Sequence, residues 1–374
     1  MMRFQIFAVL GLALLGQPAA AAITHQPWGV TPDGAKADLY TLTNAHGMQV
    51  QIATYAGTLI SIRVPDRNGR MADVLMSHPT LDEYTKVDFA GGGGHYGELI
   101  GRFANRIKNA TFTLDGKTYH LATVHGAKDY IHGGPRGLFT KVWRAAAKDG
   151  PEPRLALTIR SPDGDQGFPG NITVEVTYTL TRDNRIRINY RASTDRDTII
   201  NLTNHSYFNL KGEGDVDGTV MELFAHRYTP FAAGEIPTGE IRDVAGTAYD
   251  LTAPKPLGSQ IQDVIATMPG TRGFDTYYLA DGTAGHLRIA ARAVEPSSGR
   301  MLEVWTTQPG FVFYTPAMPR DENFRQRGFE GHPAFCVETQ HAPDAPNHPN
   351  FASTVITPDK PLHEVTEFRF SVQK

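Results

Sequence analysis

Short runs of residues with a period of two, separated by turn signals, constrain the fold of this chain more than any other feature. Successive side chains of a strand point to opposite faces, so alternating or β-branched runs predict strands. Such runs occupy residues 48–55, 59–64, 110–114, 155–159, 172–180, 185–190, 198–202, 287–291, 302–307, 311–314 and 335–339. Turn signals such as Asp115-Gly116 and Ser297-Ser-Gly299 separate them. This pattern predicts a large antiparallel sandwich or barrel.

Helical periodicity is almost absent, and only residues 80–86 and 257–265 are expected to form a helical turn or two. The 37 glycines and 25 prolines are spread along the chain, which indicates many turns and no disordered linker. We find no internal repeat and no shift in charge that marks a boundary. The sequence therefore predicts an all-β protein with few short helices, in a single domain over residues 23–374.

The first 22 residues have the pattern of a secretory signal peptide. Met1-Met-Arg3 precedes an apolar stretch over residues 4–15, too short to span a bilayer, and an alanine run ends at Ala22. We expect cleavage after about Ala22 and no membrane association afterwards. Cys336 is the only cysteine, so the chain has no intrachain disulfide and no cysteine for a lipid anchor at the cleavage site. These features predict an exported protein, periplasmic or secreted.

Composition and missing motifs exclude several classes of ligand. The formal net charge of −3 and the lack of basic runs argue against a nucleic-acid partner. The glycine run Gly91 to Gly94 lacks the residues of a phosphate or dinucleotide loop and predicts a mobile loop. The 14 histidines show no metal-binding pattern, and a lone cysteine excludes a thiolate site. We expect no metal and no cofactor, and the sequence leaves the oligomeric state open.

One segment combines a histidine with a polar face. Read as a strand, residues 201–209 place five polar or aromatic side chains on the same side, namely Asn201, Thr203, His205, Tyr207 and Asn209. Leu202 and Phe208 then lie on the opposite side. This face is typical either of a cleft wall that binds hydroxyl-rich ligands, or of a solvated strand or a satisfied core histidine.

Three other segments carry polar side chains in a predicted strand or loop from which they could contact a ligand. Asn105 and Arg106 stand side by side, and Arg106 suits either vicinal hydroxyls or a structural ion pair. His132 precedes two glycines, which allow close approach to a ligand or simply make a turn. Asp275 is the one acid of an aromatic-rich strand, where it either caps a turn or accepts hydrogen bonds from a polar ligand.

Glu338 interrupts the apolar strand 335–339, and an acid in such a place is rarely buried without a partner or a purpose. Paired with His205, it suggests a carboxylate general base and an imidazole general acid. Their ordinary pKa values of about 4.3 and 6.5 make this division workable near neutral pH.

Seven motifs occur in an order that resembles the aldose 1-epimerase (galactose mutarotase) family. They are Gly-Arg-Phe-Ala-Asn-Arg-Ile from Gly101, His-Gly-Gly from His132, Ser-Pro-Asp-Gly-Asp-Gln-Gly-Phe-Pro-Gly from Ser161, Asn-Leu-Thr-Asn-His-Ser-Tyr-Phe-Asn-Leu from Asn201, Gly-Phe-Asp from Gly273, Thr-Thr-Gln-Pro-Gly from Thr306 and Glu-Thr-Gln from Glu338. The resemblance implies a β-supersandwich and the interconversion of α and β anomers of free aldoses without a cofactor.

The resemblance also implies roles for individual residues. Glu338 becomes the base that removes the proton of the anomeric hydroxyl, and His205 the acid that protonates the ring oxygen. The positions that match sugar-binding residues of the family are Asn105, Arg106, His132, Tyr207, Asp275 and Gln308. The glycine-rich segment that ends in His95-Tyr96 and the tail from His341 to His348 depart from the family pattern, which leaves the preferred aldose open.

Two other functions fit an exported, all-β, sugar-binding chain. A glycoside hydrolase usually needs two carboxyl groups about 5 to 10 Å apart, which Asp275 and Glu338 could supply. A non-catalytic sugar-binding protein would keep the cleft without the chemistry, although both catalytic candidates are present here.

Overall fold

The computed structural model describes residues 21–90, 93–232, 234–268, 270–318 and 322–373. Residues 1–20 of the predicted signal peptide and Gly91 and Gly92 of the predicted mobile loop lie outside the described residues. Among the helices of the described part, none has the length and apolar character needed to cross a membrane.

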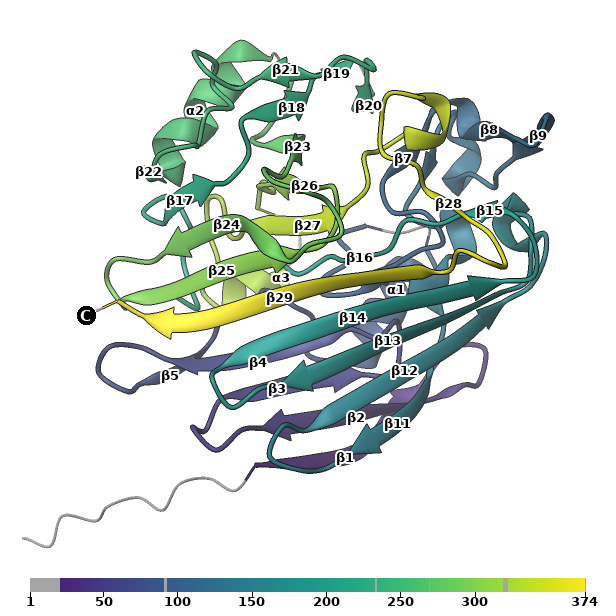
Figure 1. Ribbon diagram of the computed structural model, residues 1–374. Coiled ribbons are helices and arrows are strands. Elements are labelled where there is room, and N and C mark those ends of the chain that lie inside the picture. Colours follow the sequence, from purple (N-terminus) through teal and green to yellow (C-terminus); the bar gives the residue numbers. More distant parts are fainter. Residues whose placement is uncertain (1–20, 91–92, 233, 269, 319–321, 374) are drawn as a thin grey trace, which may run out of the picture.

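Three large antiparallel sheets dominate the described part of the chain (Figure 1). The nine strands of the largest sheet are, in spatial order, β11 (Arg144–Lys148), β12 (Arg154–Ser161), β13 (Ile172–Leu180), β14 (Arg185–Thr194), β29 (Leu362–Val372), β25 (Arg300–Thr306), β24 (Arg288–Val294), β17 (Val220–Leu223) and β22 (Lys255–Pro256). The C-terminal strand β29 pairs with both β14 and β25. It therefore joins the two halves of this sheet.

Two five-stranded sheets accompany the nine-stranded one. The first follows chain order through β1 (Ala22–Val30), β2 (Lys36–Thr43), β3 (Gln49–Ala53), β4 (Leu59–Pro65) and β5 (Met71–Asp73). The second has the spatial order β21 (Arg242–Asp243), β18 (Arg227–Thr229), β23 (Asp275–Leu279), β26 (Gly310–Tyr314) and β27 (Cys336–Gln340). In Figure 1, the first sheet lies behind strands β11 to β14, and most of the second sheet lies above β24 and β25.

One hydrophobic core connects the three sheets. Ile52 of β3 and Ile62 of β4 belong to the same buried cluster as Val176 of β13, which places the first small sheet against the large one. Phe311 of β26 and Val304 of β25 belong to that cluster too. Alternate residues of β13 are buried, as expected for strands that cover a core with one face. The predicted all-β supersandwich is confirmed.

Helices are few and short, as predicted. They are α1 (Leu81–Asp88), α2 (Leu257–Thr267) and α3 (Glu322–Gln326), with single 3₁₀ turns at Lys108–Ala110, Val124–Gly126, Gly134–Arg136, Leu138–Thr140, Asp165–Gly167 and Ala345–Asn347. Thr80 and Glu83 form a capping box that begins α1 by satisfying free backbone N–H groups.

Short two-stranded ladders hold the loops between the sheets. They pair β10 (Tyr130–Ile131) with β7 (Arg106–Ile107), β15 (Thr198–Ile199) with β28 (Val355–Ile356), β16 (Thr203–Asn204) with β6 (Leu99–Ile100), β19 (Phe231–Ala232) with β20 (Ile236–Pro237), and β8 (Thr111–Leu114) with β9 (Lys117–His120).

The regular strands predicted over 198–202 and 201–209 are wrong in extent. Only β15, β16 and isolated bridges at Asn201 and Phe208 form there. The segment changes pairing partners along its length, and every residue from 201 to 209 is buried. The prediction also missed β29, where Glu364 and Thr366 interrupt the apolar face that Phe368 and Phe370 continue. The acid Glu367 lies on the other face, buried against Arg187 and Arg369.

Candidate active site

A cavity of about 340 Å³ opens where β7, β10, β16, β23, β26 and β27 meet. Its volume is in the range of small-molecule sites. Seven of the eight residues predicted for the site line it, namely Asn105, Arg106, His132, His205, Tyr207, Asp275 and Glu338. Gln308 does not belong to the lining. Segments that are more than 200 residues apart in the sequence thus contribute to one cavity.

Strand register places the acids of the second five-stranded sheet. Glu338 lies opposite Val312 on the neighbouring strand, and Asp275 lies opposite Tyr314. Since Cys336 pairs with Tyr314 and side chains alternate along β27, Glu338 and Cys336 occupy the same face of the sheet. This face carries Glu338, Tyr314 and Asp275 into the cavity.

His205 follows β16 and is fixed by its backbone. Its N–H donates to the Glu98 carbonyl at 2.9 Å, and its own carbonyl accepts the Gly97 N–H at 2.9 Å. The imidazole stacks on the Tyr207 ring with centroids 5.0 Å apart and an interplanar angle of 10°. The ring position is therefore set by two hydrogen bonds and an aromatic neighbour.

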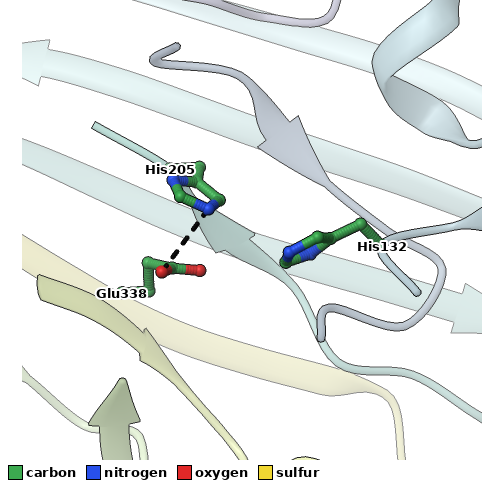
Figure 2. Close-up of side chains that lie close together, drawn as sticks. All are labelled: His132, His205 and Glu338. Atoms are coloured by element: carbon green, nitrogen blue, oxygen red, sulfur yellow. Dashed lines mark ion pairs between the residues drawn. The ribbon is translucent and has the colours of Figure 1, made fainter. Parts of the chain in front are cut away.

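His205 and Glu338 face each other across a short gap. Figure 2 shows the imidazole pointing at the carboxyl group, with Nε2 and Oε1 separated by 3.5 Å. Both side chains are almost completely buried. Within the described residues, Nδ1 of His205 and Oε2 of Glu338 are buried with no hydrogen-bond partner. Such unsatisfied groups are costly in a core and are typical of sites completed by a ligand.

Burial governs the protonation of this pair. Burial, with a smaller contribution from the neighbouring His95, lowers the pKa of His205 to about 3. Burial also raises the pKa of Glu338 well above its usual value, with a further contribution from Asp275. The cavity consequently favours a protonated Glu338 and a neutral His205, whereas its ordinary pKa would leave Glu338 as a carboxylate at neutral pH.

His132 is a second imidazole of the cavity, shown beside the pair in Figure 2. Its Nδ1 accepts the backbone N–H of Asn105 at 3.1 Å, and burial keeps its pKa well below the usual value. A neutral imidazole that accepts at Nδ1 carries its proton at Nε2, so His132 offers a donor. One atom each of His132, His205 and Glu338 lie within 4.8 Å of one another, a spacing that also suits a metal ion.

Arg106 and Asp275 make up the polar rim with Glu235. The Arg106 guanidinium contacts the Glu235 carboxylate and lies 4.0 Å from that of Asp275. Burial raises the pKa of Asp275 to about 7, against the opposing influence of Arg106. Asp275 therefore titrates in the physiological range.

Several residues of the predicted polar face have structural contacts instead. Asn201 donates to the carbonyls of Ala104 and His341, and Asn209 donates to the carbonyl of Pro333. Gln308, a predicted sugar-binding residue, donates from Nε2 to the Leu202 carbonyl at 3.1 Å. These amides hold the backbone around His205.

Sequence reasoning missed six side chains of the lining: His95, Val124, Ile131, Phe139, Glu235 and Tyr314. His95 and Tyr314 were visible only as members of a glycine-rich segment and an aromatic strand. Phe139 and Glu235 lie in segments without any ligand-binding pattern, so no local signal could have identified them.

Comparisons with known proteins identify relatives over most of the chain. The family model described as aldose 1-epimerase matches residues 38–369. Human galactose mutarotase is 36% identical over 362 residues, covering 94% of this chain and 99% of that protein. The aldose 1-epimerase of Escherichia coli K12 is 33% identical over 351 residues, with coverage of 91% and 97%.

Solved structures share the fold. The GalM/aldose epimerase homologue from C. elegans superposes with a TM-score of 0.79 at 26% identity, covering 90% of this chain and 99% of that chain. Galactose 1-epimerase from Lactobacillus acidophilus NCFM gives 0.80 at 22% identity, with coverage of 95% and 100%.

Proposed function

The chain belongs to the aldose 1-epimerase family of isomerases that act on carbohydrates, and from that premise we propose that it interconverts the α and β anomers of free aldoses such as D-glucose and D-galactose. The observation that carries this proposal is the buried His205–Glu338 pair, 3.5 Å apart in a cavity with polar walls. A facing acid and base of this kind can move protons at two oxygens of one ligand.

In the proposed reaction, the Glu338 carboxylate removes the proton from the hydroxyl at C1. His205 donates a proton to the ring oxygen, and the bond between C1 and that oxygen breaks to give the open-chain aldehyde. Rotation about the C1–C2 bond presents the other face of the carbonyl group. Closure then returns both protons and yields the opposite anomer.

The protonation that burial favours in the site fits this cycle. Ring opening leaves Glu338 protonated and His205 neutral, which is the arrangement that burial favours. The ion pair opposite the cyclic sugar and the neutral pair opposite the aldehyde contain the same number of protons. Because a buried environment penalises the charged pair, it favours proton transfer in the opening direction.

The remaining walls suit a neutral ligand rich in hydroxyls. We propose that Asn105, Arg106, His132, Tyr207 and Asp275 hold the sugar, since all five line the cavity. Charged groups and imidazoles make the strongest of these hydrogen bonds. Gln308 acts through its contact with the Leu202 carbonyl rather than on the sugar.

Polarimetry tests the function directly. Pure α-D-glucose and α-D-galactose are each mixed with the protein, and the decay of optical rotation is compared with the spontaneous rate. Nitrophenyl glycosides are offered in parallel. We expect accelerated decay without release of nitrophenol; release would instead support a glycoside hydrolase. Sugar binding with no acceleration would mean that the protein is a non-catalytic sugar binder.

We also propose that residues 1–22 are removed on export, leaving residues 23–374 as one catalytic domain in the periplasm or outside the cell. The short apolar stretch and the alanine run support this. Intact-mass measurement of the protein recovered from the cell envelope and the medium tests it. A mass that retains residues 1–22 would contradict the proposal.

A further inference from the structure

His95 is a third imidazole of the cavity, and neither the motifs nor the proposed mechanism uses it. It lines the cavity with a side chain that is 10% exposed. Its ring centroid lies 5.2 Å from that of His132 and 6.2 Å from that of His205. The Phe139 ring packs against it at 4.5 Å in an edge-to-face arrangement. His95 is therefore part of the same wall as the two other histidines.

The backbone ties this part of the wall to His205. β6 pairs with β16, with Leu99 opposite Asn204. Gly97 N–H donates to the His205 carbonyl, and His205 N–H donates to the Glu98 carbonyl. Gly97 has a φ of +86° and packs so closely that a Cβ atom would lie 2.1 Å from the Leu59 carbonyl oxygen. Hydrogen bonds thus fix the backbone two and three residues after His95 against His205.

Behind His95 lies a chain of buried polar groups. Nδ1 of His95 is 2.8 Å from Oε2 of Glu98, whose side chain is fully buried. Asp88 is buried next to Glu98 and accepts a hydrogen bond from the Tyr55 hydroxyl at 2.8 Å. A carboxylate aimed at one imidazole nitrogen sets the tautomer and orientation of the ring.

Burial disfavours the charged forms of His95, Glu98 and Asp88. Burial raises the pKa of Glu98 to about 8, and burial together with the Glu98 carboxylate raises the pKa of Asp88 well above its usual value. Two carboxyl groups this close do not both ionise readily, so the pair keeps at least one proton at neutral pH. Burial also lowers the pKa of His95, which keeps its ring neutral.

A neutral imidazole that donates from Nδ1 has its lone pair at Nε2. Within the described residues no hydrogen bond is recorded for Nε2 of His95, and the ring lines the cavity. His132 has the opposite arrangement, because its Nδ1 accepts from Asn105 and its proton is at Nε2. Two neighbouring imidazoles therefore offer one acceptor and one donor, which matches a sugar hydroxyl that both donates and accepts.

We propose that His95 is a substrate-binding residue of this site, which accepts a hydrogen bond from one hydroxyl of the bound aldose at Nε2 while Glu98, backed by Asp88, holds its proton at Nδ1. The identity of the ligand rests on the proposed function. Glu98 and Asp88 are positioning residues, since they act through the ring of His95.

A bound cation is the competing explanation of the cluster, because Asp88, His95 and Glu98 offer donor atoms within 4.8 Å of one another. The hydrogen bonds favour the proposal. His95 Nδ1 and Glu98 Oε2 are at hydrogen-bond distance, and Asp88 accepts a hydrogen bond from the Tyr55 hydroxyl. The groups therefore contact protein partners directly.

The test measures sugar binding to the full-length mature protein by NMR titration, with D-glucose and its 2-, 3-, 4- and 6-deoxy analogues. His95→Phe keeps an aromatic ring against Phe139 and removes both nitrogens. We expect it to raise the Kd for glucose about 5-fold, as for loss of a hydrogen bond between neutral groups. His120→Phe, at an exposed position on β9, is the matched control and leaves the Kd unchanged.

The deoxy sugars identify the hydroxyl. For one analogue, we expect the Kd of the wild-type protein to be about 5-fold higher than its Kd for glucose. For that analogue, His95→Phe should not raise the Kd further. If His95→Phe binds every sugar with the Kd of the wild type, the inference is overturned. It is also overturned if His95→Phe raises the Kd by the same factor for glucose and for all the deoxy analogues, because such a uniform loss of affinity indicates general distortion of the site.

The tautomer gives a second readout that a packing role would not move. In ¹⁵N spectra at pH 7.5, we expect the wild-type His95 to be neutral with its proton at Nδ1, and Glu98→Gln to shift the ring toward the Nε2–H form. Finding the wild-type proton at Nε2 would contradict the proposal. So would a change in glucose Kd on EDTA treatment that Zn²⁺ reverses, because a cation would then hold the cluster.

Binding and turnover separate this inference from the proposed function. Normal mutarotation with an unchanged Kd in His95→Phe overturns only the inference. Binding that depends on His95, without any acceleration of mutarotation by the wild type, overturns only the proposed catalytic function.

Discussion

Arg102 and the His205–Glu338 pair are both buried and polar, yet their surroundings differ completely. The Arg102 guanidinium donates to Ser161 Oγ and to four backbone carbonyls, those of Ser161, Pro162, Pro169 and Gly170, at 2.7 to 2.9 Å. His205 and Glu338 instead leave Nδ1 and Oε2 without partners in the described structure.

The number of hydrogen-bond partners distinguishes a buried group with a structural role from one that is available for a ligand. Burial lowers the pKa of Arg102 to about 10, which still leaves the side chain charged at neutral pH because its five acceptors stabilise the cation. Glu338 and His205 lack such partners, and burial drives both toward their neutral forms. A saturated buried group fixes the fold, whereas an unsaturated one is available for a ligand. Arg102 belongs to the first class, and the His205–Glu338 pair belongs to the second.

The largest effect is expected for the catalytic pair. Glu338→Gln and His205→Asn should each reduce the turnover of aldose anomerisation roughly 100-fold or more, the range for loss of general acid–base catalysis. Polarimetry measures turnover, and thermal unfolding should show a stability close to that of the wild type because neither substitution removes a side-chain hydrogen bond. Glu175→Gln, at an exposed position of β13, is the matched control. Near-normal turnover in either catalytic variant would contradict the proposed acid–base mechanism.

Arg102→Leu should give the opposite result. The substitution leaves buried carbonyls without donors, and we expect the free energy of unfolding to fall by about 3 kcal/mol. Denaturant titration measures this loss, with Arg191→Leu at an exposed position of β14 as the control. Turnover per folded molecule should change little. An unchanged stability would mean that the contrast between the two regions is false.

Asp275→Asn is expected to weaken sugar binding without removing either proton-transfer group. Loss of a charged acceptor should raise the KM for glucose roughly 10-fold, with a smaller change in kcat. Initial rates over a range of sugar concentrations separate the two constants. A fall confined to kcat would place Asp275 in the chemical step.

The pH profile tests the same carboxyl group. Since burial raises the pKa of Asp275 to about 7, its carboxylate form is lost as pH falls through 7, and kcat/KM should decline several-fold between pH 8 and pH 6. In Asp275→Asn this decline should be weaker. A wild-type profile that is flat over this range would contradict the assignment.

The smallest effect is expected for metal removal. The spacing of His132, His205 and Glu338 also suits a metal ion, but the proposed acid–base chemistry needs none. Dialysis against EDTA should leave turnover within the error of the assay, with a buffer-dialysed sample as control. Loss of activity that Zn²⁺ restores would move these residues into a metal centre.

Much of the fold follows from local patterns. Ile172 to Leu180 alternates so regularly that its predicted limits and those of β13 coincide. The two predicted helices are present because a capping box and apolar spacing act within a few residues. β29 was missed because Glu364 and Thr366 occupy positions that share a face with Phe368 and Phe370 and break the apolar alternation. On its other face, the buried acid Glu367 is compensated by Arg187 and Arg369, and only the fold brings Arg187 near.

The candidate site was predictable in its chemistry and less so in its membership. Glu338 was identified because an acid in an apolar strand needs a reason. The polar face of residues 201–209 was expected to act as one unit, yet His205 and Tyr207 line the cavity while Asn201 and Asn209 bond to backbone. For His95, the only local signal was that its glycine-rich segment departs from the family pattern.

The sequence by itself therefore determined the all-β class, the order of the motifs and the pair of residues suited to acid–base chemistry. These depend on side-chain type and on periodicity over a few residues. Only the tertiary structure decided which polar groups remain unsatisfied, that Gln308 contacts a backbone carbonyl, and that His95 joins the cavity. The physical reason is that a side chain's partners come from strands far apart in the sequence, and their register and burial set its pKa and its free hydrogen-bonding atoms.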